Sequence, residues 1–229
     1  MVLRYHGKAV PLPSLRAACG PEDSNAALVR SIAFSNHLLG THQAIEVLVI
    51  AGRVALVHRE VMPAIYALVR RRRPPSDLEG LSQAARLAHS LILQQREVAA
   101  GDVRRHLGVT RTGTSHDPAY EALAELQRAL LVDRGPFDMP AKGVPYLSRD
   151  GYPYHLFHQA HAGLVKAASR LSLEAAADRV LGAYLKTAGP TVPRRLSSLF
   201  KLFLNKEEIA ASLDRLASLG LLREPAPYN

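Results

Sequence analysis

Three histidines beyond the middle of the chain have a spacing at which side chains can share a metal ion. His155, His158 and His161 lie within YHLFHQAHAG, at positions i, i+3 and i+6. On one helix the first two could chelate a metal, but the third would lie about 120° further round the axis. There is no cysteine nearby, and no acidic residue is obviously placed as another ligand. We therefore expect ordinary surface histidines, without a metal or other cofactor.

The familiar catalytic signatures are missing from the sequence. It contains no glycine-rich phosphate loop, no GxSxG nucleophile elbow and no HExxH metal motif. Asp102 and Asp117 have no convincing partner, and a pairing of Glu46 with Glu60 would be arbitrary. The sequence therefore leans away from an enzyme.

Basic and hydroxyl side chains suggest a different chemistry, which is the binding of phosphate groups. The chain has 29 Lys and Arg residues against 20 Asp and Glu, a formal charge of +9. Such an excess favours polyanionic partners, and double-stranded DNA is the one we expect. Hydroxyls, amides and guanidinium groups beside a helix N-terminus suit phosphate contacts. The candidate nucleic-acid-binding residues are Arg70, Arg71, Arg72, Arg104, Arg105, Thr110, Arg111, Thr112, Thr114, Ser115, His116, Arg128, Arg194, Arg195, Lys201 and Lys206.

The first third of the chain supplies a helix, a hairpin and a second helix. Apolar spacing predicts a helix over 23–40. The segment 45–58, IEVLVIAGRVALVH, is dense in Val, Leu and Ile, which favours two strands turning near Ala51-Gly52. A buried helix is the alternative. A helix over 59–71 should follow, with Pro63 in its first turn.

The run RRRRPPSD over 70–77 predicts a linker. Four consecutive arginines repel one another, and Pro74-Pro75 cannot continue a helix. Two roles fit these arginines equally well: a solvated helix end, or a patch that contacts phosphate.

From residue 81 onward, one order of elements occurs twice. Each copy has three helices followed by a strand, and a connecting helix over 158–170 joins the copies. The first copy has helices over 81–95, 99–108 and 119–132 and a turn-rich hairpin over 133–158; the second has helices over 172–189, 193–204 and 205–220 and a strand over 221–224.

Matching apolar positions support this internal repeat. Leu123, Leu126, Leu131 and Val132 correspond to Leu213, Leu216, Leu221 and Leu222 at an offset of 90, and Val103 and Leu107 correspond to Leu196 and Phe200 at an offset of 93. The pattern predicts two winged helix-turn-helix units.

The third helix of each copy carries a capping signal. Asn205 with Glu208 forms a capping box in the second copy, and Asp117 with Pro118 starts the helix in the first. Glu207 and Glu208 would repel phosphate, so we expect the second copy to be the weaker DNA reader and to serve in packing or dimerisation.

Four motifs together resemble the winged-helix crosslink-repair (alkylpurine) DNA glycosylase family. They are GRVALVHREVMPAIYAL, GDVRRHLG with AYEALAELQRALLV, the aromatic GYPYHLFH, and AAADRVLGAYLKTAGP with LFKLFLNKEEIAASLDRLASLGLL. The resemblance covers roughly residues 45–224 and implies tandem winged helices around a DNA-binding concavity. The family's Gln-x-Gln catalytic signature is absent, since Gln94 and Gln95 are adjacent, so what the resemblance carries over is DNA binding without the activity.

We therefore predict a mainly α protein with small β-hairpins, an α+β fold of tandem winged helix-turn-helix units. The expected regions are 1–73 (helix and hairpin), 81–158 (first winged-helix unit with a long wing) and 159–229 (second unit with a truncated wing). The expected function is non-catalytic DNA binding in repair or genome maintenance. Alternatives are a transcriptional regulator, a glycosylase with an altered active site, and a protein-interaction module. We expect a cytoplasmic, nucleoid-associated protein that forms no membrane contact and is a candidate homodimer.

Overall fold

The computed structural model describes residues 2–3, 14–21, 24–110, 117–135, 153–188 and 193–221. Within these residues the chain is mostly helical, with two small three-stranded antiparallel sheets. The α+β class predicted from the sequence is thus confirmed. None of the helices in the described part of the chain is both long enough and apolar enough to cross a membrane.

The N-terminal part forms one sheet and the helices beside it. Its elements are β1 (Val2–Leu3), α1 (Leu15–Ala18), α2 (Asn25–Gly40), β2 (Ala44–Ile50), β3 (Arg53–His58) and α3 (Met62–Arg70). The Ser24 hydroxyl caps α2 by accepting a hydrogen bond from the Ala27 amide at 3.1 Å. β1 and β2 flank β3 in the sheet.

The predicted hairpin at β2 and β3 is confirmed. Ala51 and Gly52, the two turn residues, both have positive φ angles, of 53° and 66°. Two consecutive positive φ angles give the turn a twist that matches paired strands. Val47 pairs with Ala55 in β3, and both side chains are completely buried.

The middle part of the chain forms a second sheet with three helices. Its elements are α4 (Gln83–Gln95), β4 (Glu97–Ala99), α5 (Ala100–His106), α6 (Pro118–Arg128), β5 (Val132–Arg134) and β6 (Pro153–Leu156). The sheet has the order β4-β6-β5 and is antiparallel throughout. The predicted pairing of the two hairpin ends is confirmed, whereas β4 was not expected. The residues predicted to form the long wing, 136–152, lie outside the described residues.

All the described secondary-structure elements in the last part of the chain are helices. Its elements are α7 (Phe157–Ala160), α8 (Ala162–Ala168), α9 (Leu173–Ala188), α10 (Pro193–Phe200) and α11 (Lys206–Ser218). The single connecting helix predicted over 158–170 is divided into α7 and α8, because His161 has a non-helical backbone, with φ −127° and ψ 41°.

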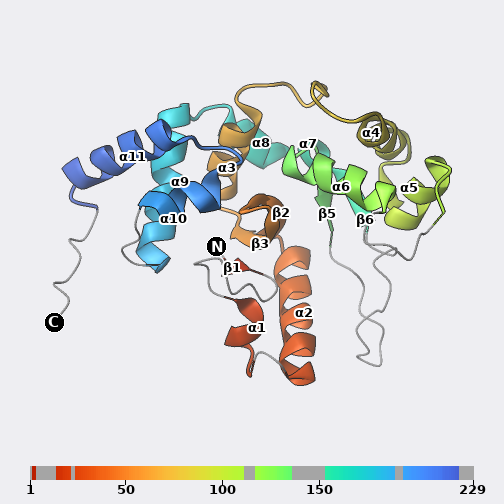
Figure 1. The fold of residues 1–229 in the computed structure, drawn as a ribbon, viewed down its shortest axis with the longest axis horizontal. Helices are drawn as coiled ribbons and strands as arrows, with labels where there is room; N and C mark the ends of the chain where they lie inside the picture. Colours follow the sequence, from red (N-terminus) through yellow and green to blue (C-terminus); the bar gives the residue numbers. More distant parts are fainter. Residues whose placement is uncertain are drawn as a thin grey trace.

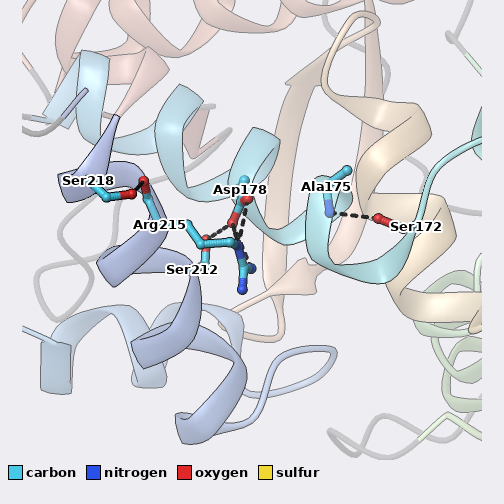
Figure 2. Close-up of polar contacts among 6 residues, drawn as sticks. All are labelled: Ser172, Ala175, Asp178, Ser212, Arg215 and Ser218. Carbon is cyan, nitrogen blue, oxygen red and sulfur yellow. Dashed lines mark hydrogen bonds and ion pairs between the residues drawn. The ribbon is translucent and has the colours of Figure 1, made fainter. Parts of the chain in front are cut away.

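A polar network ties α9 to α11 (Figure 2). The Asp178 carboxylate accepts a hydrogen bond from the Ser212 hydroxyl at 2.6 Å and three from the Arg215 guanidinium, at 2.8, 2.9 and 3.2 Å. The predicted capping box also forms, with Asn205 and Glu208 exchanging hydrogen bonds of 2.8 and 2.9 Å.

The two copies of the predicted repeat differ after their third helix. Leu131 is 2% exposed and adjoins β5, whereas its counterpart Leu221 is 65% exposed and belongs to no strand. The remaining residues of the strand predicted over 221–224 lie outside the described part. Among the helix positions, Leu196 is as fully buried as its counterpart Val103, whereas Phe200 is fully buried and its counterpart Leu107 only partly.

Two main apolar clusters hold these elements together. One contains side chains from β2, β3 and α3 together with α7 to α11 and Leu130, and the other lies within α4 to β6. The first and third regions predicted from the sequence therefore share a core. In Figure 1 the α4–β6 unit and α9–α11 lie at opposite ends of the long axis, with α3, β2 and β3 between them.

Contacts between β2 and the α4–β6 unit join the two clusters. Glu46 on β2 is almost completely buried and forms an ion pair with Arg134 on β5. Helix α6 also packs against β2. Within the first cluster, Tyr66 on α3 stacks on Phe157 of α7 with ring centroids 5.2 Å apart. Glu46, considered as a catalytic group from the sequence alone, is thus part of the interior.

Candidate nucleic-acid interface

Arg104 and Arg105 are neighbours on α5 with different surroundings. The Arg104 guanidinium contacts the Asp117 carboxylate at 2.6 Å through Nη2 and at 3.1 Å through Nε, and the residue is 8% exposed. It also lies over the Tyr120 ring, 5.5 Å from the centroid. Arg105 has a side chain that is 78% exposed and pairs with Asp102 one turn earlier. Of the two arginines expected to contact phosphate, only Arg105 points its charge outward.

Asp117 explains this difference, because it has two structural functions at the start of α6. Its Oδ1 accepts a hydrogen bond from the Ala119 amide at 3.0 Å, which caps the helix. Its Oδ2 holds Arg104. Arg104 thus has a structural function that joins α5 to α6, and its predicted contact with phosphate stays a prediction.

The loop before α6 is only partly described. Thr110 is exposed, while five other predicted contact residues lie outside the described part: Arg111, Thr112, Thr114, Ser115 and His116. In α6 itself, Glu121 lies in the first turn and exposed Arg128 in the last. Both third helices of the repeat thus begin with acidic residues, and the sequence-based ranking considered only Glu207 and Glu208.

The basic residues of the second copy lie on the surface. Arg194 and Arg195 are exposed in the first turn of α10, Lys201 follows that helix, and Lys206 begins α11. The helices that carry them lie at the opposite end of the molecule from α5 and α6 (Figure 1). The two predicted basic sets therefore belong to separate ends of the protein.

The four arginines at the end of α3 and directly after it have different surroundings: one is buried, one is paired across the fold, and two are directed to solvent. Arg70 is 6% exposed and donates hydrogen bonds to the carbonyl oxygens of Ala129, Pro74 and Asp77. Arg71 donates to Glu208 and to the Phe203 carbonyl at 2.9 Å.

The other two arginines of the run point outward. Arg72 is exposed, and Arg73 reaches Asp77 at 3.7 Å with a side chain that is 56% exposed. Of the three arginines predicted to contact phosphate here, Arg70 is buried, Arg71 is partly exposed but paired with Glu208, and Arg72 is exposed without a described partner.

The three spaced histidines do not share one helix. His155 lies in β6, where its Nδ1 is 3.7 Å from Glu97, whereas His161 contacts Asp133 at 2.7 Å. Burial lowers the pKa of His158 on α7. The described ranges contain no group of three metal-binding side chains.

The sequence analysis did not identify one buried histidine. His89 on α4 is 6% exposed, and its pKa is lowered by burial first, then by His158 and by Arg70. Its position one turn after buried Ala85 was the available signal, since residues at i and i+4 share a helix face.

Comparisons with protein-family models, with curated proteins and with solved structures find no match to this chain. The resemblance to the glycosylase family thus rests on the quoted motifs. Gln94 and Gln95, the residues nearest to its catalytic signature, are exposed at the end of α4.

Proposed function

We propose that this protein binds duplex DNA without sequence preference, through the unit formed by α4 to β6. The supporting observation is the order of its elements: helix, strand, two helices and two strands, with the first strand paired to the last. Winged-helix domains have this order and pairing, with the wing between the last two strands. In such domains the third helix approaches the major groove. Here that helix is α6.

The charge distribution supports a mode that depends on the DNA backbone. The whole chain has a formal charge of +9. Arg105 and Arg128 are exposed on α5 and α6, but Arg128 lies in the last turn of α6, and the first turn, which would approach the base edges, contains no arginine. Contacts to phosphate are sequence-independent and weaken with salt. We therefore assign the α4–β6 unit the principal contact, with α10 and α11 as an auxiliary basic surface.

A salt series with two matched variants tests this proposal. Fluorescence anisotropy would measure binding to a random duplex by the wild type, by Arg105→Glu/Arg128→Glu and by Arg194→Glu/Lys206→Glu. Each double variant reverses two exposed charges. The first should reduce the slope of log K against log salt by about 2, since each lost phosphate contact removes about 0.9. The Arg194→Glu/Lys206→Glu variant should reduce this slope by less than half as much. Equal slopes in the two variants would contradict the ranking of the two ends.

A protein-interaction module is the second candidate, and two observations favour it. Arg104 is bound to Asp117 inside the unit, and α6 packs against β2, which covers part of a helix that DNA readers expose. If the folded wild type does not bind duplex even at low salt, this second function replaces the first.

A further inference from the structure

A pocket of about 580 Å³ lies beside α3, separate from α5 and α6. Its walls come from the last turns of α3, from the arginine run that follows, and from α8 with the segment leading into α9. This volume lies within the range of pockets that hold small molecules. Its walls differ in character: one side is apolar and the other is cationic.

The apolar side is built from the main core of the protein. Tyr66 and Ala67 on α3 face Val165 on α8, and Leu171 and Leu173 complete the wall. Tyr66 is 6% exposed and stacks on Phe157, so this wall is held by the interior behind it. Such a surface would bind the apolar body of a ligand by removing it from water.

The cationic side has three arginines and no acidic lining residue. Arg72 is exposed and makes no hydrogen bond or ion pair with any residue that the structure describes. Arg70 binds main-chain carbonyls through its Nη atoms, and its buried Nε has no hydrogen-bond partner among the described groups. The carboxylate of Asp77 lies 3.7 Å from the Arg73 guanidinium and balances the charge of that arginine. The pocket thus has positive charge in excess of its described partners.

The backbone of the arginine run fixes this arrangement. Arg71 and Arg72 have φ angles of 43° and 66°, in the left-handed region that is unfavourable for residues with a Cβ. Glu208 and the Phe203 carbonyl hold Arg71 on the α11 side. The following residues, Arg72 and Arg73, then line the pocket instead of continuing α3. Backbone strain of this kind is commonly kept where it places a functional side chain.

We propose that this pocket binds a small anionic amphiphile, in which a carboxylate or phosphate head meets Arg72 and Arg73 and an alkyl body covers the apolar wall. Guanidinium groups bind such heads through paired, charge-assisted hydrogen bonds. A DNA backbone would satisfy the arginines but leave the apolar wall uncovered, and for this reason the amphiphile is the better match. The inference does not depend on the proposed DNA binding.

Calorimetric titration of the full chain with decanoate, below the concentration at which it forms micelles, tests this proposal. We expect saturable one-to-one binding and a raised Tm, because a ligand that binds the folded state stabilises it. Decyl phosphate should bind as well, whereas decanol and inorganic phosphate should each bind at least tenfold more weakly. Equal affinity for decanol and decanoate, or for inorganic phosphate and decyl phosphate, would overturn the proposal, as would no saturable binding.

Three variants locate the binding. Arg72→Gln should weaken decanoate binding about tenfold, the loss expected when one charge-assisted hydrogen bond is removed. Ser169→Phe should block the pocket, since Ser169 lines it and is exposed. Arg59→Gln, which removes an exposed arginine before the start of α3, should bind as the wild type does. Wild-type affinity in Arg72→Gln refutes the assignment even if Ser169→Phe does not fold, because Arg72 has no described contact that folding needs.

Discussion

Arg71 and Glu208, 137 residues apart in the sequence, form a two-point contact: Nη1 lies 2.8 Å from Oε1, and Nη2 lies 2.9 Å from Oε2. The same guanidinium donates to the Phe203 carbonyl, and the same carboxylate closes the capping box of α11. This contact fixes the residue after α3 to the turn that precedes α11.

Removing this contact should destabilise the protein measurably. Arg71→Met loses the ion pair and leaves the Phe203 carbonyl without this donor, and we expect a loss of about 1 kcal/mol in the free energy of unfolding. Urea denaturation measures it. Arg72→Met is the matched control: it changes the adjacent residue, which is also left-handed but has no described partner, and it should lie within about 0.5 kcal/mol of the wild type. Equal losses in both variants would show that the contact itself contributes nothing.

The Arg71 contact should also depend on pH. The hydrogen bond from Arg71 is the largest cause that lowers the pKa of Glu208 below its ordinary value of 4.5. A carboxyl whose pKa is lowered in the folded state contributes stability above its unfolded pKa and loses it as the pH falls through the folded value. The difference in unfolding free energy between wild type and Arg71→Met should therefore be constant from pH 7 to 5 and shrink below about pH 4.5. A difference that stays constant down to pH 3 would contradict this linkage.

Buried His89 should make the protein sensitive to mild acid. Burial, and then the charges of His158 and Arg70, lower its pKa from the ordinary 6.5, so the folded state holds the neutral ring. The unfolded chain takes up a proton near pH 6.5 and the folded chain only at lower pH, so stability falls as the pH drops below about 6.5.

The variant His89→Leu should lose less stability than the wild type between pH 7 and 5, as followed by thermal unfolding. Ser90→Ala, at an exposed position on the same helix, serves as the control and should follow the wild-type curve. If His89→Leu and wild type give parallel curves, another group causes the acid sensitivity.

Arg104 and Arg105 should respond oppositely to the same substitution. Arg104→Met leaves the largely buried Asp117 carboxylate without its cation, and breaking a buried pair in this way costs about 3–5 kcal/mol. Arg105→Met removes an exposed charge and should change stability by less than about 0.5 kcal/mol. Denaturation measures stability, and the anisotropy assay measures DNA affinity at a temperature where both variants are folded. Arg105→Met should weaken DNA binding, and Arg104→Met should retain most of it. A stable Arg104→Met variant that no longer binds DNA would show that Arg104 does contact DNA.

The amino-acid sequence alone determined the elements that depend on local interactions. The helix starts at Asp117 and Asn205 follow from side chains that bind backbone amides two or three residues later. The hairpin over β2 and β3 follows from its Val and Ile content and from a turn at Ala51-Gly52 that Gly can occupy at positive φ. These signals lie within a few residues of their effects, and so they could be predicted before the fold was known.

Tertiary structure decided which chemistry each polar side chain performs. Strand β4 has three residues and forms only because Val98 pairs with Tyr154 on β6, which is distant in the sequence. Arg70 and Arg72 have the same side chain and are two residues apart in the sequence, but the left-handed turn at Arg71 and Arg72 leaves Arg70 buried and Arg72 exposed. The physical reason is that burial and charge pairing are set by neighbours distant in sequence, whereas capping and turn formation are set by adjacent residues.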